Sequence, residues 1–189
     1  MSFKVMIGYP AMPSDKGVPL ISQNRQFQWF NRPTFIFPVV PASAATLLAS
    51  RGYEVIWADG VAEQMSELQY AQWVGREQPD LIAFEVKTPV VKRTWKAIEA
   101  LRKVSPSTKF VLMGDHITGL PEESFAHCSV DYCLTGGDFD FALLNLCEHL
   151  SKGTVLEPGV YARDGETIQN SGPFSLKHDL DGLPMIDRD

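Results

Sequence analysis

The chain has few cysteines, and no two of them stand at the spacing of a metal-binding or redox motif. Cys128, Cys133 and Cys147 are the three cysteines among 189 residues, and no pair has CxxC spacing. An odd number disfavours a disulfide framework, and a zinc site made only of cysteine would lack its fourth ligand. We therefore expect reduced thiols in or near the core of an intracellular protein.

Long apolar runs and an excess of positive charge are also absent. Nothing approaches the stretch of about 20 apolar residues that a membrane-spanning helix needs, and no signal-peptide pattern opens the chain. The formal net charge of -6 disfavours nucleic acid as the main partner, because phosphate binding needs clustered lysine and arginine. With 44% hydrophobic residues the chain can bury a core. We expect a folded cytoplasmic protein with no membrane span.

Short apolar runs alternate with helical patterns along the first 150 residues. The runs predict strands at residues 3–9, 53–58, 81–86, 109–113 and 130–134. The helical patterns between and after them cover residues 42–50, 66–77, 91–104, 121–127 and 139–150. Near-continuous apolar strands are typical of a parallel sheet that is covered on both faces.

This order predicts an α/β fold with a doubly wound, five-stranded parallel sheet. Right-handed crossovers favour the flavodoxin-like, Rossmann-like strand order 2-1-3-4-5. Ligands of such sheets bind outside the carboxyl ends of the strands, near the point where the strand order reverses. The loops that follow the five strands are therefore the candidate site.

Two regions do not fit the simple repeat. Residues 10–41 form a long connection that is rich in proline and aromatic residues, including Phe27, Trp29, Phe30, Phe35 and Phe37. Such a connection either packs over a flat ligand or another domain, or simply covers one edge of the sheet. Residues 154–189 contain Asp164-Gly165, a hairpin signal, and then a proline-containing, charged end. We expect an α/β domain at residues 1–153, and a C-terminal hairpin and linker at residues 154–189.

Several segments, taken in order, carry a resemblance to a known family. They are residues 41–60 (PASAATLLASRGYEVIWADG), 79–89 (PDLIAFEVKTP), 109–123 (KFVLMGDHITGLPEE) and 130–138 (VDYCLTGGD). Together they resemble the N-terminal cobalamin (B12)-binding domain of B12-dependent radical SAM enzymes. The anaerobic magnesium-protoporphyrin IX monomethyl ester cyclase-like group and the B12-dependent methyltransferases are the members considered first. The tail, with GVYARDGETIQN and DLDGLPMIDRD, is similar to the peptide that joins this domain to the radical SAM barrel.

The resemblance implies a module that binds cobalamin within an enzyme that also uses SAM and a [4Fe–4S] cluster. The family holds its cluster with a CxxxCxxC motif, which this chain lacks, so the cluster and SAM sites are expected outside it. We expect no catalysis by the chain alone, and a C-terminal radical SAM barrel as its partner. The resemblance leaves methyl transfer and cyclisation open. The alternative is a stand-alone, non-catalytic cobalamin carrier or sensor.

No histidine stands where many cobalamin carriers place one beneath the cobalt. Their Asp-x-His-x-x-Gly motif follows the first strand, where this chain has Tyr9-Pro10-Ala11-Met12-Pro13. Asp115-His116-Ile117-Thr118-Gly119 is one residue short between Asp and His, and it follows the fourth predicted strand. We therefore expect His116 to line the binding surface, and the cobalt to lack a protein imidazole on its lower face.

The predicted cofactor-binding residues lie in the loops after the strands, and no catalytic or metal-binding residue is predicted. Lys87 is a candidate donor to the nucleotide phosphate or to a corrin amide, although a solvated ion pair with Glu85 is the simpler expectation. Glycines at the strand ends either let a ligand approach or serve ordinary turns. The predicted set is Tyr9, Pro10, Val86, Lys87, Thr88, Gly114, Asp115, His116, Thr118, Thr135, Gly136 and Gly137.

Two other protein classes share this fold. A response-regulator-like domain needs acidic residues after the first strand, Asp after the third and Lys after the fifth, where this chain has Tyr9-Pro10, Glu85 and Thr135. A dinucleotide-binding domain needs GxGxxG in the first turn, which is also missing. The residues after the strands of this chain therefore disfavour both a response-regulator-like domain and a dinucleotide-binding domain.

Overall fold

The parallel part of the sheet has the expected strand order. The computed structural model describes residues 2–21, 27–32 and 34–188. Its main sheet runs β4-β1-β5-β6-β7-β8-β9, and the first five of these strands are parallel. Their bounds are Lys4–Tyr9 (β1), Glu54–Asp59 (β4), Leu81–Glu85 (β5), Lys109–Met113 (β6) and Tyr132–Leu134 (β7). In chain order the parallel strands therefore lie 2-1-3-4-5, which confirms the prediction.

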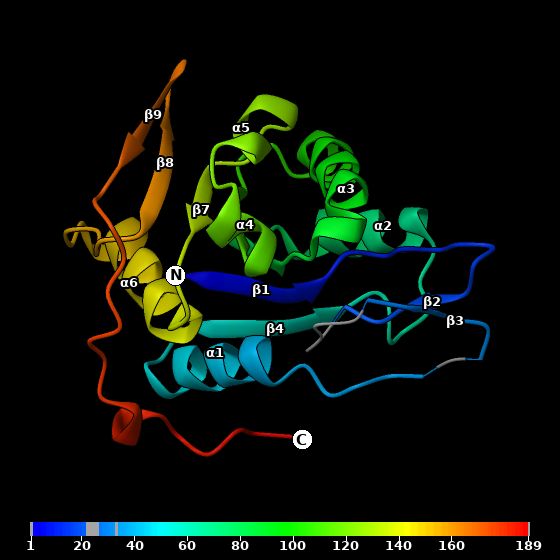
Figure 1. Cartoon of the computed structure of the whole chain (residues 1–189), viewed down its shortest axis with the longest axis horizontal. Coiled ribbons are helices and arrows are strands. Elements are labelled where there is room, and N and C mark those ends of the chain that lie inside the picture. Colours follow the sequence, from blue (N-terminus) through cyan, green and yellow to red (C-terminus); the bar gives the residue numbers. More distant parts are fainter. Residues whose placement is uncertain (1, 22–26, 33, 189) are drawn as a thin grey trace.

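Helices cover both faces of the sheet (Figure 1). On one face, α1 (Val39–Ser50) and α6 (Phe139–Lys152) bury leucines against Val5 and Ile7 of β1. On the other, α2 (Glu67–Glu77), α3 (Val91–Val104) and the short α4 (Asp115–Gly119) and α5 (Glu123–His127) pack against Met6 and Phe84. Alternate residues of β1 thus enter opposite halves of the core, as the two-residue period of a strand requires.

The sheet has seven strands, not the expected five. The hairpin forms where Asp164-Gly165 predicts it, as β8 (Val160–Asp164) and β9 (Thr167–Asn170). Its first strand pairs antiparallel with β7, where Leu134 lies opposite Val160. The hairpin therefore completes the β7 side of the sheet, and Figure 1 shows its tip projecting beyond the helices.

The long connection after β1 covers the carboxyl end of that strand. Val18–Pro19 (β2) pairs with Trp29–Phe30 (β3) in a small antiparallel sheet, while residues 22–26 and 33 lie outside the described part of the chain. Arg93 of α3 holds the connection by donating to the Pro13 carbonyl over 2.9 Å and by lying 5.0 Å from the Trp29 ring. Phe35 and Phe37, farther along the connection, remain exposed.

The tail after β9 crosses the end of α6 and continues along α1, where the described chain ends (Figure 1). It contains one short turn of helix, η2 (Leu180–Gly182). Near its end the Asp187 backbone N–H donates to Thr46 of α1 over 3.0 Å.

Other sequence expectations concern the core and the membrane. Cys128, Cys133 and Cys147 are buried and unpaired, as expected. Among the described residues, no helix has the length and apolar character needed to span a membrane.

Candidate functional site

The candidate site lies where the chain switches from one face of the sheet to the other. Neighbouring strands β1 and β5 lead to helices on opposite faces, so their carboxyl ends flank the switch point. Tyr9 ends β1 and Glu85 ends β5, and the Tyr9 hydroxyl donates a hydrogen bond to Glu85 Oε2. Both residues are buried, with 3% and 7% of their surface exposed. A carboxyl group thus lies inside the protein at the position where such folds bind ligands.

Lys87 connects this buried carboxyl group to the surface. Its Nζ lies 3.5 Å from Glu85 Oε1 and 2.6 Å from Asp115 Oδ2. The Lys87 side chain is 13% exposed and that of Asp115 is 76% exposed. The expected solvated Glu85–Lys87 pair is therefore wrong for Glu85, because this residue is buried at the end of a central strand.

Burial dominates the electrostatics of the switch point. It raises the pKa of the Glu85 carboxyl, while the Tyr9 hydrogen bond and the Lys87 charge act in the opposite direction. Burial, and then the nearby Glu85 charge, raise the pKa of Tyr9 far above its ordinary value. Tyr9 is therefore a protonated phenol that donates to Glu85.

His116 lies inside the protein, although we expected it to line the binding surface. It is 5% exposed, and its Nδ1 lies 3.2 Å from Thr88 Oγ1. Its Nε2 lies 3.1 Å from Glu123 Oε2, but the angle between these buried atoms does not meet hydrogen-bond geometry. The imidazole therefore tethers the loop after β5 to α4 and points toward α5.

Thr118 and Thr135 connect loops at the carboxyl end of β7. Thr118 Oγ1 donates to the Gly136 carbonyl over 3.3 Å and accepts from the Gly136 N–H over 3.2 Å. Thr135 Oγ1 donates to the Gly159 carbonyl over 2.8 Å. Both hydroxyls are therefore engaged within the chain.

The tail packs against the glycines of this second region. A Cβ atom at Gly136 would lie 2.7 Å from the Phe174 ring, and one at Gly137 would lie 3.4 Å from Leu176 Cδ2. A cavity of about 220 Å³ remains between the tail and the start of α6. The absence of side chains at these glycines therefore makes room for the tail.

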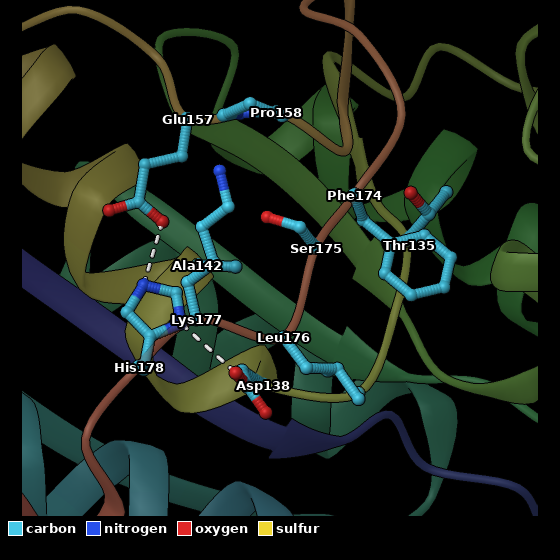
Figure 2. A pocket seen from close by; sticks show the side chains of 11 residues that line it. Thr135, Asp138, Ala142, Glu157, Pro158, Phe174, Ser175, Leu176, Lys177 and His178 are labelled. Carbon is cyan, nitrogen blue, oxygen red and sulfur yellow. Dashed lines mark hydrogen bonds and ion pairs between the residues drawn. The ribbon is translucent and has the colours of Figure 1, made fainter.

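His178 fastens the tail over this cavity. Its Nδ1 lies 3.0 Å from Asp138 Oδ2 and its Nε2 lies 3.0 Å from Glu157 Oε2, as the dashed lines in Figure 2 show. The ring also stacks on Phe141 with centroids 4.4 Å apart. Both ring nitrogens therefore face a carboxyl group, one at the start of α6 and one in the segment before β8.

The structure divides the predicted residues into separate groups. Tyr9, Lys87, Thr88, Gly114, Asp115 and His116 gather around the ends of β1, β5 and β6. Thr118, Thr135, Gly136 and Gly137 gather around the end of β7. Val86 is fully buried, and Pro10 lines a small cavity between α2 and α3.

The predicted set omitted Glu85 and the tail residues Phe174 and His178. Glu85 has a local signal, because it is the one charged residue in the apolar run LIAFEV. The tail residues have none, because their contacts are with segments far from them in sequence.

Fold and site together define an open, doubly wound α/β domain with a polar cluster at its switch point. No protein-family model and no curated protein matches the chain. Among solved structures it is similar to the radical SAM methyltransferase TsrM from Kitasatospora setae, with cobalamin and a [4Fe–4S] cluster bound. The TM-score is 0.69 at 17% identity, over 97% of this chain and 31% of TsrM.

A second similar structure is the cobalamin-dependent SAM radical enzyme OxsB with aqua-cobalamin and SAM bound. The TM-score is 0.70 at 12% identity, over 93% of this chain and 23% of OxsB. The chain thus spans less than a third of either enzyme, and these likenesses concern the fold.

Proposed function

We propose that this chain is a cobalamin-binding module of a radical SAM enzyme, with the sites for SAM and the [4Fe–4S] cluster in other parts of that enzyme. The observation that carries the proposal is the fold. More than nine-tenths of the chain matches segments of two enzymes whose structures contain cobalamin.

The polar groups at the switch point suit the chemistry of cobalamin. The corrin ring carries carboxamide side chains on its rim, each with an N–H donor and a carbonyl acceptor. Lys87 supplies a donor and Asp115 an acceptor within 2.6 Å of each other, and Thr88 is exposed beside them. The donor set therefore fits a large, amide-rich ligand.

The histidines are consistent with a cobalt ion that has no imidazole of this chain beneath it. His116 is turned inward, and His127 stacks on Trp95 with centroids 4.6 Å apart. His149 lies near the end of α6, and His178 is bound in the tail. When bound, cobalamin would supply the organometallic chemistry, whereas Lys87, Asp115 and Thr88 would hold and orient the ring.

Titration with hydroxocobalamin, followed by gel filtration and visible absorbance, tests the proposal. We expect the wild-type chain to retain the cofactor with a base-off spectrum. Thr88→Arg should block retention, because it places a long charged side chain at the exposed edge of the site. Glu166→Arg, on the hairpin turn, is the matched control and should bind like wild type. A folded wild-type chain that retains no cobalamin would contradict the proposal.

His116→Ala tests whether that histidine only connects segments of the chain or also ligates the cobalt. We expect the retained cofactor to keep the same spectrum, because the imidazole faces Thr88 and Glu123. A changed spectrum at unchanged occupancy would instead indicate cobalt ligation.

A CxxxCxxC motif in a reading frame that continues past residue 189 would separate the radical SAM module from a stand-alone carrier or sensor.

A further inference from the structure

The Lys87–Asp115 pair joins a mostly buried cation to an exposed carboxylate. Lys87 Nζ lies 2.6 Å from Asp115 Oδ2 and 3.5 Å from Glu85 Oε1. Of the three side chains, that of Asp115 is exposed to solvent on most of its surface, whereas those of Lys87 and Glu85 are mostly buried. A ligand that approaches this edge therefore meets the Asp115 carboxylate first and the Lys87 ammonium beside it.

The chain holds Asp115 from both sides. Gly114 has a φ of +113°, and a Cβ atom there would lie 2.7 Å from the Val86 carbonyl oxygen. On the other side, His116 is buried against Thr88. These neighbours fix the backbone of Asp115 opposite Lys87, so the pair is already arranged before a ligand binds, which lowers the entropy lost on binding.

The charges of the cluster select against an anion. Two carboxyl groups, of Glu85 and Asp115, flank the single ammonium of Lys87. A phosphate group at Lys87 would approach the exposed Asp115 carboxylate, and like charges repel at such distances. A neutral group that accepts from the ammonium and donates to the carboxylate meets no such repulsion.

A primary carboxamide has this arrangement, because its carbonyl oxygen and its NH₂ group lie side by side. We infer that Lys87 and Asp115 together bind one propionamide of the corrin ring, with Lys87 donating to its oxygen and Asp115 accepting from its N–H. The propionamides project to the same face of the ring as the nucleotide tail, and the assignment places that face toward the switch point. The inference rests on that function and assigns these residues a role in ligand specificity.

The three monocarboxylic acids of cyanocobalamin, in each of which one propionamide has become a carboxylate, test this assignment. One isomer should bind the wild-type chain at least about tenfold more weakly than cyanocobalamin, because its carboxylate meets Asp115 instead of donating to it. Asp115→Asn should restore most of the affinity for that isomer, since the asparagine N–H donates to the new carboxylate. Asp164→Asn, an exposed substitution on the hairpin, should keep the wild-type pattern.

The outcomes distinguish this inference from the proposed function. If all three isomers bind wild type as tightly as cyanocobalamin, the inference is overturned while cobalamin binding stands. The same holds if the weakened isomer stays equally weak in Asp115→Asn, with thermal unfolding showing that this variant is folded. If wild type does not bind cyanocobalamin or hydroxocobalamin, both proposals fail.

Discussion

At the scale of single residues, the buried carboxyl group of Glu85 is the feature with the clearest energetic consequences. A carboxylate inside a protein is costly unless hydrogen bonds and charges compensate for its lost hydration. Tyr9 supplies the hydrogen bond and Lys87 the positive charge. The stability of the switch point therefore depends on a few polar atoms.

Removing the Tyr9 hydroxyl should leave Glu85 without its donor. We expect Tyr9→Phe to lower the free energy of unfolding by about 1–3 kcal/mol, the usual cost of an unsatisfied buried polar group. Urea denaturation would measure the change. Tyr132→Phe, at a half-buried tyrosine in β7, should cost less, and equal losses in both variants would contradict the expectation.

The pKa of Glu85 predicts a dependence of stability on pH. Burial raises this pKa above its ordinary value of 4.5, so the folded chain binds the proton more tightly than the unfolded chain. The stabilising contribution is complete below the unfolded pKa and is lost as the pH rises through the folded pKa. Glu85→Gln should therefore lose less stability than wild type as the pH rises from 4.5.

Thermal unfolding measured at a series of pH values from 4.5 upward would test how steeply the stability of each protein depends on pH. Asp59, whose pKa burial also raises, is present in both proteins and cancels in the comparison. Glu166→Gln, on the exposed hairpin turn, should follow the wild-type slope. Parallel curves for Glu85→Gln and wild type would show that Glu85 is not the titrating group.

At the scale of elements, the tail packs against the loop between β7 and α6. Phe174 lies against Gly136, and His178 bridges Asp138 and Glu157. We infer that the glycine at position 136 is needed for this packing. The tail then forms part of the wall around the carboxyl edge of the sheet.

Gly136→Ala tests that requirement. The substitution introduces a Cβ at a φ of +102° and 2.7 Å from the Phe174 ring, whereas Gly153 has a φ of +75° and no neighbour within 4 Å. Both alanines should cost about 1 kcal/mol of backbone strain, and Gly136→Ala should cost more because of the clash. Phe174→Ala in the same chain should remove the excess. If the two glycine variants are equally stable, the tail does not constrain Gly136.

At the scale of the whole molecule, the hairpin is bound to the body by more than strand pairing. Arg163 of β8 donates to the carbonyls of Phe125, Cys128 and Val130 over 2.7, 3.0 and 3.0 Å. Its guanidinium therefore satisfies backbone acceptors at the end of α5 and in the segment before β7. A domain boundary at residue 153 remains a prediction, and this contact offers a way to test it.

We expect Arg163→Ala to lower the global stability by about 2–3 kcal/mol, because buried carbonyls lose a charged donor. Tryptophan fluorescence reports on Trp29, Trp57, Trp73 and Trp95, all of which precede residue 153. Its unfolding transition and that of far-UV circular dichroism should shift together. Arg76→Ala, at the exposed end of α2, should leave both transitions in place. An earlier transition in circular dichroism with an unchanged tryptophan transition would instead support a separate unit after residue 153.

The sequence alone determined most of the parallel sheet and its helices. Residues 109–113 and 91–104 form the predicted strand and helix with the predicted bounds, and the strand order agrees. These features depend on hydrophobic periodicity and on the handedness of crossovers, which short segments of sequence express. The loops of the site could be located for the same reason, because they must follow the strands.

Only the tertiary structure decided which side chains meet there. The Tyr9–Glu85 hydrogen bond joins residues 76 positions apart, and the contact of His178 with Asp138 spans 40. The pairing of the hairpin with β7, the inward turn of His116 and the tail over Gly136 likewise depend on segments distant in sequence. Local patterns specify which elements form, whereas the burial of a carboxyl group or the cover over a glycine is set by packing between elements.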